Sequence, residues 1–186
     1  MPSFPKLERP LSDGNVTLRI ATERDIPEIL IAHQDDPELY LRLGMDRPPS
    51  GAELGRRFER ADEDRATGRK LTMAILEPES DVCRGEVNAH HVQWEHQRAE
   101  LGIWLAPDAR GKGLARGALR LAAGWLLTEC GLQRVELLTE PDNDPMIRSS
   151  LAAGFTYEGV LRSYLKEQGV RIDAVVLSLI AGDLAG

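Results

Sequence analysis

Residues 99–120 contain the sequence pattern that most limits how this chain can fold. Leu101–Leu105 carries aliphatic side chains at alternate positions, as a β-strand with one buried face does, and Pro107 ends the run because proline cannot donate a backbone hydrogen bond. From Leu114 to Trp125 the hydrophobic residues instead recur every three or four positions, the spacing of one helix face. The segment therefore predicts a strand, a glycine-rich turn and a helix in direct succession.

The turn between this strand and this helix has the composition of a phosphate-binding site. Gly111 and Gly113 lack side chains, so backbone N–H groups can approach a ligand closely, and the N-terminus of the following helix favours an anion. Positions 110–120 hold no acidic residue and four basic ones: Arg110, Lys112, Arg116 and Arg120. A basic segment in a chain with a net charge of −7 indicates that the turn binds phosphate groups.

Two other phosphate-binding motifs fit the turn less well. The Walker pattern of a P-loop is absent from the chain. A dinucleotide-binding fingerprint is a closer alternative, because Gly111 and Gly113 follow a strand and Glu136 lies in the next one. However, Arg116 stands where that fingerprint has a small residue, and three further strands precede the strand that leads into the turn, which in the fingerprint is the first strand.

Outside this segment the hydrophobic pattern predicts an α/β domain. We expect residues 1–13 to form an irregular arm and residues 14–182 to form one domain with a mixed six- to seven-stranded sheet and helices on both faces. The expected strands are residues 16–20, 71–76, 85–94, 99–106, 134–139, 155–161 and 172–180. Helices are expected after Thr22, after Ser50 with its capping residue Glu53, over 112–130, and after Asn143.

The composition excludes several classes of protein. A pI near 5.2 argues against a general nucleic-acid or anionic-membrane binder, because both need a basic surface. No hydrophobic run approaches the roughly 20 residues that cross a bilayer. Cys83 and Cys130 lack metal or redox spacing, and no export signal precedes them, so we expect reduced thiols in a cytoplasmic protein.

The landmarks of the chain, taken in order, resemble those of a known enzyme superfamily. Arg110-x-x-Gly113-x-Ala115 after a strand that contains Glu100-Leu101-Gly102 resembles the signature of the GNAT superfamily of N-acetyltransferases. Three downstream features resemble its branch of ribosomal-protein N-terminal acetyltransferases of the RimJ/RimL type: Asn143 followed by Gly154-Phe155, then Glu158-Gly159, and the tail from Gly169 to Asp173. The resemblance covers about residues 14–181.

This resemblance implies a GNAT fold in which acetyl-CoA lies in a V-shaped splay between the strands at 100–106 and 134–139. The backbone of Ile103, Trp104 and Leu105 would then bind the pantetheine arm. The backbone amides of Arg110, Gly111, Lys112, Gly113, Leu114 and Ala115 would hold the pyrophosphate. Asn143 would bond the cofactor or an ordered water; as a plain helix cap it would use one side-chain oxygen and leave its amide nitrogen free.

The resemblance also implies direct transfer of acetyl from acetyl-CoA to a primary amine, with catalytic roles for Glu100, Asn143 and Tyr157. Glu100 is the first candidate for a base that acts through water, although it fits equally well as a structural carboxylate; Glu158 is second. The family usually has a serine as acid where this chain has Met146, so Tyr157, Tyr164 or solvent would protonate the thiolate. An inactive acyl-CoA-binding module is the alternative function.

We expect no metal site. His90 and His91 are adjacent on an expected strand, so their side chains should face opposite sides and could not chelate together. His91 alone could lie near the amine pocket. The acceptor amine, a protein N-terminus or a small molecule, is left open by the sequence, and so is a homodimer.

Overall fold

The computed structural model describes residues 3–185, which contain a mixed sheet of eight strands in the order β1-β2-β3-β4-β5-β6-β8-β7. The strands are β1 (Leu11–Ser12), β2 (Thr17–Ile20), β3 (Leu71–Leu76), β4 (Cys83–Gln93), β5 (Arg98–Leu105), β6 (Arg134–Thr139), β7 (Thr156–Glu167) and β8 (Val170–Ile180). The helices are α1 (Ile26–Asp35), α2 (Leu39–Arg42), α3 (Gly51–Ala66), α4 (Leu114–Thr128) and α5 (Asp144–Ala152), with short 3-10 turns η1 (Glu23–Asp25), η2 (Pro107–Ala109) and η3 (Ala181–Ala185).

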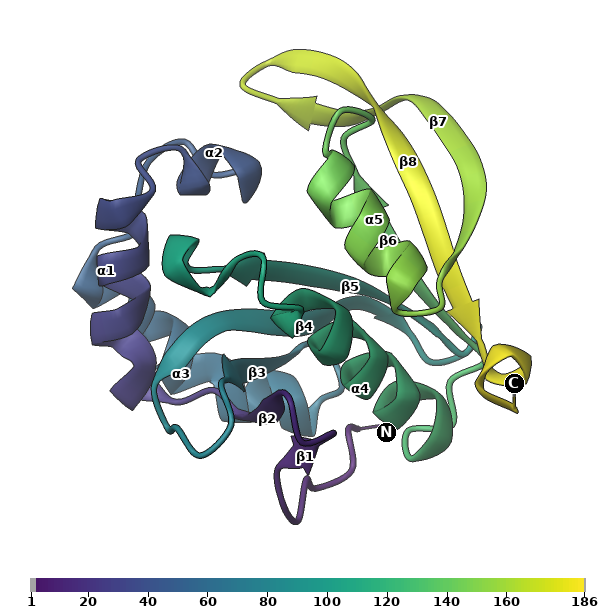
Figure 1. Ribbon diagram of the computed structural model, residues 1–186, viewed down its shortest axis with the longest axis horizontal. Coiled ribbons are helices and arrows are strands. Elements are labelled where there is room, and N and C mark those ends of the chain that lie inside the picture. The colour runs from purple at the N-terminus through teal and green to yellow at the C-terminus, as the bar shows by residue number, and fades with distance from the viewer. Residues whose placement is uncertain (1–2, 186) are drawn as a thin grey trace.

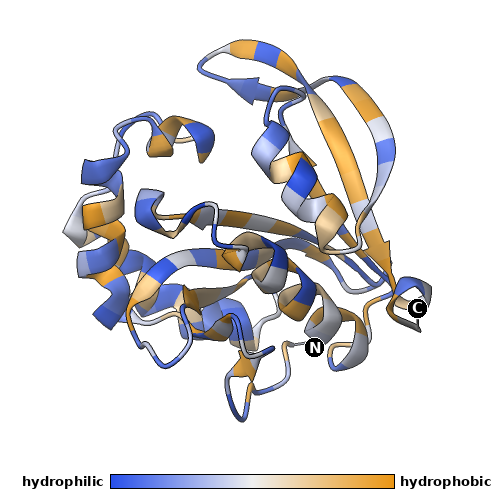
Figure 2. Ribbon diagram, in the orientation of Figure 1, coloured by the Kyte–Doolittle hydropathy of each residue, from blue (hydrophilic) through white to orange (hydrophobic). Residues whose placement is uncertain are grey.

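Helices cover both faces of the sheet, as the sequence predicts. The main hydrophobic core lies under α4 and α5, whereas a second cluster lies under α1 and α3 on the opposite face (Figure 1). The strand β8 is mostly hydrophobic in Figure 2, and Ala174–Leu179 are all buried. Because successive side chains of a strand point to opposite faces, this run shows that β8 is shielded on both sides.

The sheet divides between its two central strands. β5 pairs with β6 in parallel only from Arg98–Glu100 to Arg134–Glu136, a register of three residue pairs. Beyond Glu100, β5 keeps its partner β4, and β6 keeps its partner β8. The two halves of the sheet therefore diverge from the end near the C-terminus (Figure 1), which is the V-shaped splay that the sequence resemblance implies.

The predicted strands 71–76 and 134–139 and the capped helix α3 are confirmed. The sheet has one strand more than expected, because the two residues of β1 form a short hairpin with β2. β7 and β8 form a longer hairpin than expected, which turns at Gln168-Gly169. Residues 3–10 are irregular, as predicted, yet Phe4 is buried and its ring lies 5.3 Å from that of Trp94. The N-terminal arm thus packs on the domain.

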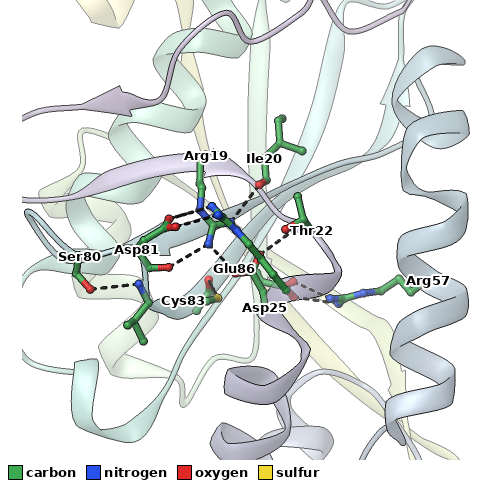
Figure 3. A network of polar contacts seen from close by, with 12 residues as sticks. Arg19, Ile20, Thr22, Asp25, Arg57, Ser80, Asp81, Cys83 and Glu86 are labelled. Atoms are coloured by element: carbon green, nitrogen blue, oxygen red, sulfur yellow. Dashed lines mark hydrogen bonds and ion pairs between the residues drawn. The ribbon is translucent and has the colours of Figure 1, made fainter.

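A buried polar network fixes the start of α1 against the sheet (Figure 3). The guanidinium of Arg19 on β2 donates at 2.7 and 2.9 Å to Asp25, whose side chain is only 2% exposed. Asp25 also accepts the backbone N–H of Thr22 at 2.9 Å, at the point where the sequence predicts that a helix begins. The same arginine bonds Asp81, so that three separate segments meet at one cation.

Two glycines of α4 provide a matched test of how closely this helix packs on the segment around Val16. A Cβ at Gly117 would lie 2.5 Å from Val16 Cγ1, whereas one at Gly124 would meet no atom within 4 Å. We expect Gly117→Ala to lower the free energy of unfolding by about 1–3 kcal/mol through overpacking. Gly124→Ala should raise it by about 0.5–1 kcal/mol, because alanine favours the helix. Urea titration of tryptophan fluorescence measures both; equal stabilities would contradict the close contact.

Candidate active site

The turn between β5 and α4 leaves backbone donors without partners. Gly111 and Gly113 adopt left-handed conformations, with φ of 76° and 81°, and Gly113 is the N-cap of α4. Within residues 3–185, the N–H groups of Gly111, Lys112 and Gly113 donate no hydrogen bond. Together with the first N–H groups of α4, they form a set of donors at the positive end of a helix.

The basic side chains of this turn are engaged elsewhere. Arg110 donates to Asp36 at 2.6 Å and to the carbonyl oxygen of Leu105 at 3.1 Å, while Lys112 donates to Glu77 at 2.7 Å. Burial acts to raise the pKa of Asp36, but the hydrogen bond and charge of Arg110 outweigh it, so this pKa lies below its usual value. Within the turn, the groups that are free to bind an anion are therefore those of the main chain, whereas Arg116 and Arg120 on α4 are exposed and have no ion-pair partner among residues 3–185.

Beyond the short β5–β6 pairing, one edge of β5 faces the splay. A Cβ at Gly85 on β4 would lie 2.2 Å from the carbonyl oxygen of Trp104, so that carbonyl points toward β4. Because backbone groups alternate in direction along a strand, those of Ile103 and Leu105 point toward the splay. Arg110 already binds the carbonyl oxygen of Leu105. The backbone of Ile103 and the N–H of Leu105 remain as polar groups for an extended ligand.

The side chain of Trp104 anchors this strand to the helices. It is 9% exposed and packs with residues of α1 and α3, and its indole N–H donates to Glu86 at 3.1 Å. Arg57 of α3 binds the same carboxylate through two hydrogen bonds of 2.7 and 3.0 Å (Figure 3). The buried Glu86 thereby joins α3, β4 and β5.

Glu100, the first candidate for the base, lies in a cluster with two histidines. His91 Nδ1 is 2.9 Å and His90 Nε2 is 3.3 Å from its carboxylate oxygens. The prediction that these histidines face opposite sides is wrong. His91 has a left-handed backbone with φ of 48°, next to a register shift between His90 and Gln93, so the strand alternation breaks there and the two rings lie 4.6 Å apart.

The environment of Glu100 keeps its carboxylate ionised. Burial acts to raise its pKa, but hydrogen bonds from His90 and His91 outweigh that effect, and the pKa lies below its usual value. The side chain keeps 23% of its surface exposed, so a water molecule can reach it. An ionised carboxylate with access to water can accept a proton from a nearby amine.

Glu158, the second candidate for the base, is held as an ion pair. Arg134 donates to both of its carboxylate oxygens, and Ser178 Oγ donates at 2.6 Å. The hydrogen bond from Arg134 is the main reason that the pKa of Glu158 falls to about 2. Such a carboxylate is a weak proton acceptor, and its contacts join β6, β7 and β8.

Asn143 caps α5, but its amide group is not free. Its Oδ1 accepts the backbone N–H of Met146 at 3.4 Å, and its Nδ2 donates to Thr139 Oγ1 at 2.9 Å. The expectation of a free amide nitrogen is therefore wrong; Thr139, at the end of β6, was not foreseen as its partner. Met146 packs half-buried against the core.

The remaining candidate acids and nucleophiles lie in different surroundings. Tyr157 and Tyr164 on β7 are 47% and 54% exposed, and within the described residues neither hydroxyl has a hydrogen-bond partner. Burial raises the pKa of the Cys130 thiol to about 12, so this cysteine is no nucleophile at neutral pH.

Between residues 3 and 185, no helix has the length and hydrophobicity that crossing a membrane requires.

The assignment of Glu158 as a structural carboxylate is testable through pH. Glu158→Gln should be less stable than the wild type at pH 7, because Arg134 loses one of its two anionic partners and keeps only Glu136. Folding lowers the pKa of Glu158 from 4.5 to about 2. The difference in the free energy of unfolding between the wild type and Glu158→Gln should therefore shrink as the pH falls from 4.5 toward 2. Urea unfolding at several pH values measures it, with Glu95→Gln in an exposed turn as the control. A difference that is constant with pH would contradict the assignment.

Comparison with known proteins assigns the family. Residues 15–156 match the profile described as Acetyltransferase (GNAT) domain. The chain is 36% identical to spermidine N(1)-acetyltransferase of Escherichia coli K12, over 81% of this chain and 77% of that protein. It is 30% identical to the uncharacterized N-acetyltransferase YoaA of Bacillus subtilis, over 95% and 97% of the two chains. A solved structure of Mycobacterium smegmatis RimJ in complex with CoA-disulfide superposes with a TM-score of 0.81 at 25% identity, over 96% and 88%. The chain therefore belongs to the GNAT family of acetyltransferases, which confirms the fold and the enzyme class predicted from its sequence.

Proposed function

We propose that this enzyme binds acetyl-CoA in the splay between β5 and β6 and transfers its acetyl group to a primary amine there. The observation that carries the proposal is the row of unpartnered N–H groups at Gly111, Lys112 and Gly113, at the N-terminus of α4. These donors suit the pyrophosphate of CoA. The backbone of Ile103 and the N–H of Leu105 continue the row along β5 and suit the amide groups of the pantetheine arm.

In this proposal the acceptor binds beside Glu100 as a cation and must become a neutral amine before it attacks the thioester. An α-amine has a pKa of about 7.7–8.0 and a lysine-type amine about 10.4, so a polyamine needs more help from a base than a protein N-terminus does. The carboxylate of Glu100 draws the cationic amine in and takes its proton through a water molecule. Both acceptor classes have precedents among the relatives, whose names include a spermidine acetyltransferase and RimJ.

In the chemical step, the amine nitrogen bonds to the thioester carbonyl carbon and the C–S bond then breaks. Glu100 takes the ammonium proton through water before the attack. The nitrogen loses its second proton to solvent as the C–S bond breaks, and the CoA thiolate takes a proton from an acid that solvent then reprotonates. Met146 has no proton to give, so we assign this acid to Tyr157 or Tyr164 on β7, whose exposed hydroxyls have no partner among residues 3–185, or to solvent. In our assignment Asn143 acts indirectly, because its bonds to Thr139 and Met146 fix the start of α5.

The role of residues 110–113, which we call the phosphate turn, is tested with two glycines, one directly before α4 and one shortly after it. Gly113 and Gly131 both have left-handed backbones, with φ of 81° and 70°, and a Cβ at either would meet no atom within 4 Å. Alanine at each site carries a similar strain of about 1–2 kcal/mol. Only Gly113→Ala should weaken CoA binding, by at least about tenfold, because relief of the strain turns the N–H groups of this turn away from the ligand.

Isothermal titration with CoA measures both affinities in the folded variants. Gly131→Ala is the control and should bind CoA as the wild type does. If the two variants bind CoA equally well, the phosphate groups are held elsewhere.

The role of Glu100 is tested by Glu100→Gln. We expect kcat to fall by roughly 10²–10⁴, the range for removal of a positioned proton acceptor, while CoA affinity stays unchanged. The loss should shrink as the pH rises, because more of the amine is then already neutral. Glu158→Gln should keep its kcat, since Arg134 holds that carboxylate. Thiol release with polyamine and peptide acceptors is the assay.

Full activity of Glu100→Gln at pH 7 would make Glu100 a structural residue. Saturable CoA binding by the wild type, without thiol release for any amine, would instead support a binding module.

A further inference from the structure

His90, His91 and Glu100 form a three-residue cluster, which we call the triad, on the face of the sheet that lies under α1 and α3. One ligand atom from each residue lies within 4.8 Å of the other two. We infer that the triad binds a divalent transition-metal ion, with Zn²⁺ the best match. No role in CoA binding accounts for the two imidazoles, because the phosphate turn lies at the opposite end of β5.

The backbone brings the two adjacent histidines to the same carboxylate. In a regular strand their side chains would point to opposite faces. The left-handed conformation of His91, with φ of 48°, lies in the bulge between β4 and β5 and turns its ring back toward Glu100. This conformation is costly for a residue other than glycine, and such strain is concentrated at functional sites.

The donor set is that of a zinc site with an open position. Two imidazole nitrogens and a carboxylate oxygen suit Zn²⁺ and other late first-row ions, whereas Mg²⁺ and Ca²⁺ prefer oxygen ligands alone. Ligand atoms around tetrahedral zinc lie about 3.4 Å apart, given bonds of about 2.0–2.2 Å. His91 Nδ1 lies 2.9 Å from one carboxylate oxygen of Glu100 and His90 Nε2 lies 3.3 Å from the other, so small shifts would bring the carboxylate and both imidazoles onto one ion. His91 is 75% exposed, so an ion can enter from solvent.

The surroundings of the triad indicate moderate affinity. Histidine ligands of tight sites donate their second N–H to a carboxylate or carbonyl group. Nδ1 of His90 is buried, and within the described residues it has no hydrogen-bond partner. The absence of that partner typically weakens metal binding by about 10–100-fold. We therefore expect a micromolar dissociation constant, which is typical of a reversibly bound ion and not of a structural metal site.

A bound ion would stop acetyl transfer. It would occupy the carboxylate that accepts the proton in our proposed function and would repel the cationic amine. Inhibition thus rests on the proposed function, whereas metal binding does not.

The test is zinc titration of untagged protein, followed by competition with a chromophoric chelator. The wild type should bind one Zn²⁺ with micromolar affinity, and excess Mg²⁺ should not displace it. His91→Asn should bind at least tenfold more weakly; asparagine tolerates the left-handed backbone, so the fold is kept. His96→Ala removes an exposed histidine from the turn after β4 and should bind as the wild type does. Thermal melts of the metal-free variants confirm folding.

Equal zinc affinity in the wild type and folded His91→Asn, or no saturable binding by the wild type, would overturn the inference. Inhibition of thiol release is measured separately, at zinc concentrations around the dissociation constant. Binding at the triad without inhibition would confirm the metal site and overturn the role of Glu100 as base.

Discussion

The parallel pairing of β5 with β6 is the contact on which the rest of the structure depends. It extends over only three residue pairs, after which each strand keeps its outer partner alone. If the pairing were longer, the backbone groups of Ile103 and Leu105 would be used within the sheet. If it were absent, the two halves of the sheet would have no common edge. The short register therefore creates an opening lined by main-chain donors and acceptors and still holds its two walls in place.

Local sequence signals predicted most of the fold. Pro107, the capping box at Ser50 and the strand-like composition of residues 71–76 each act over a few residues, and each is confirmed. The burial of Phe4 could not be read in the same way, because its partners Trp94 and Trp125 are about 90 and 120 residues away in the chain. Such contacts depend on how the whole domain closes.

Prediction of the site failed where one residue departs from its expected backbone. The rule that adjacent strand residues face opposite sides holds for regular strands. His91 departs from it because its backbone is left-handed, which no local sequence motif predicts. Asn143 was predicted correctly as a cap, but its second bond depends on Thr139 at the end of β6. The two candidate bases, Glu100 and Glu158, could not be separated by sequence either. Their difference is that one meets histidines near solvent and the other a permanently charged arginine.

The turn at residues 110–113 is held in its shape by contacts within the chain. The left-handed glycines set its path, and the contacts of Arg110 with Asp36 and Leu105 tie it to two other segments. The loss of chain entropy that accompanies ordering of a loop has therefore already occurred during folding. In our proposed function, an anion that binds these amides loses only its own freedom and its water, so we expect the chain to bind even a fragment of CoA such as a lone pyrophosphate.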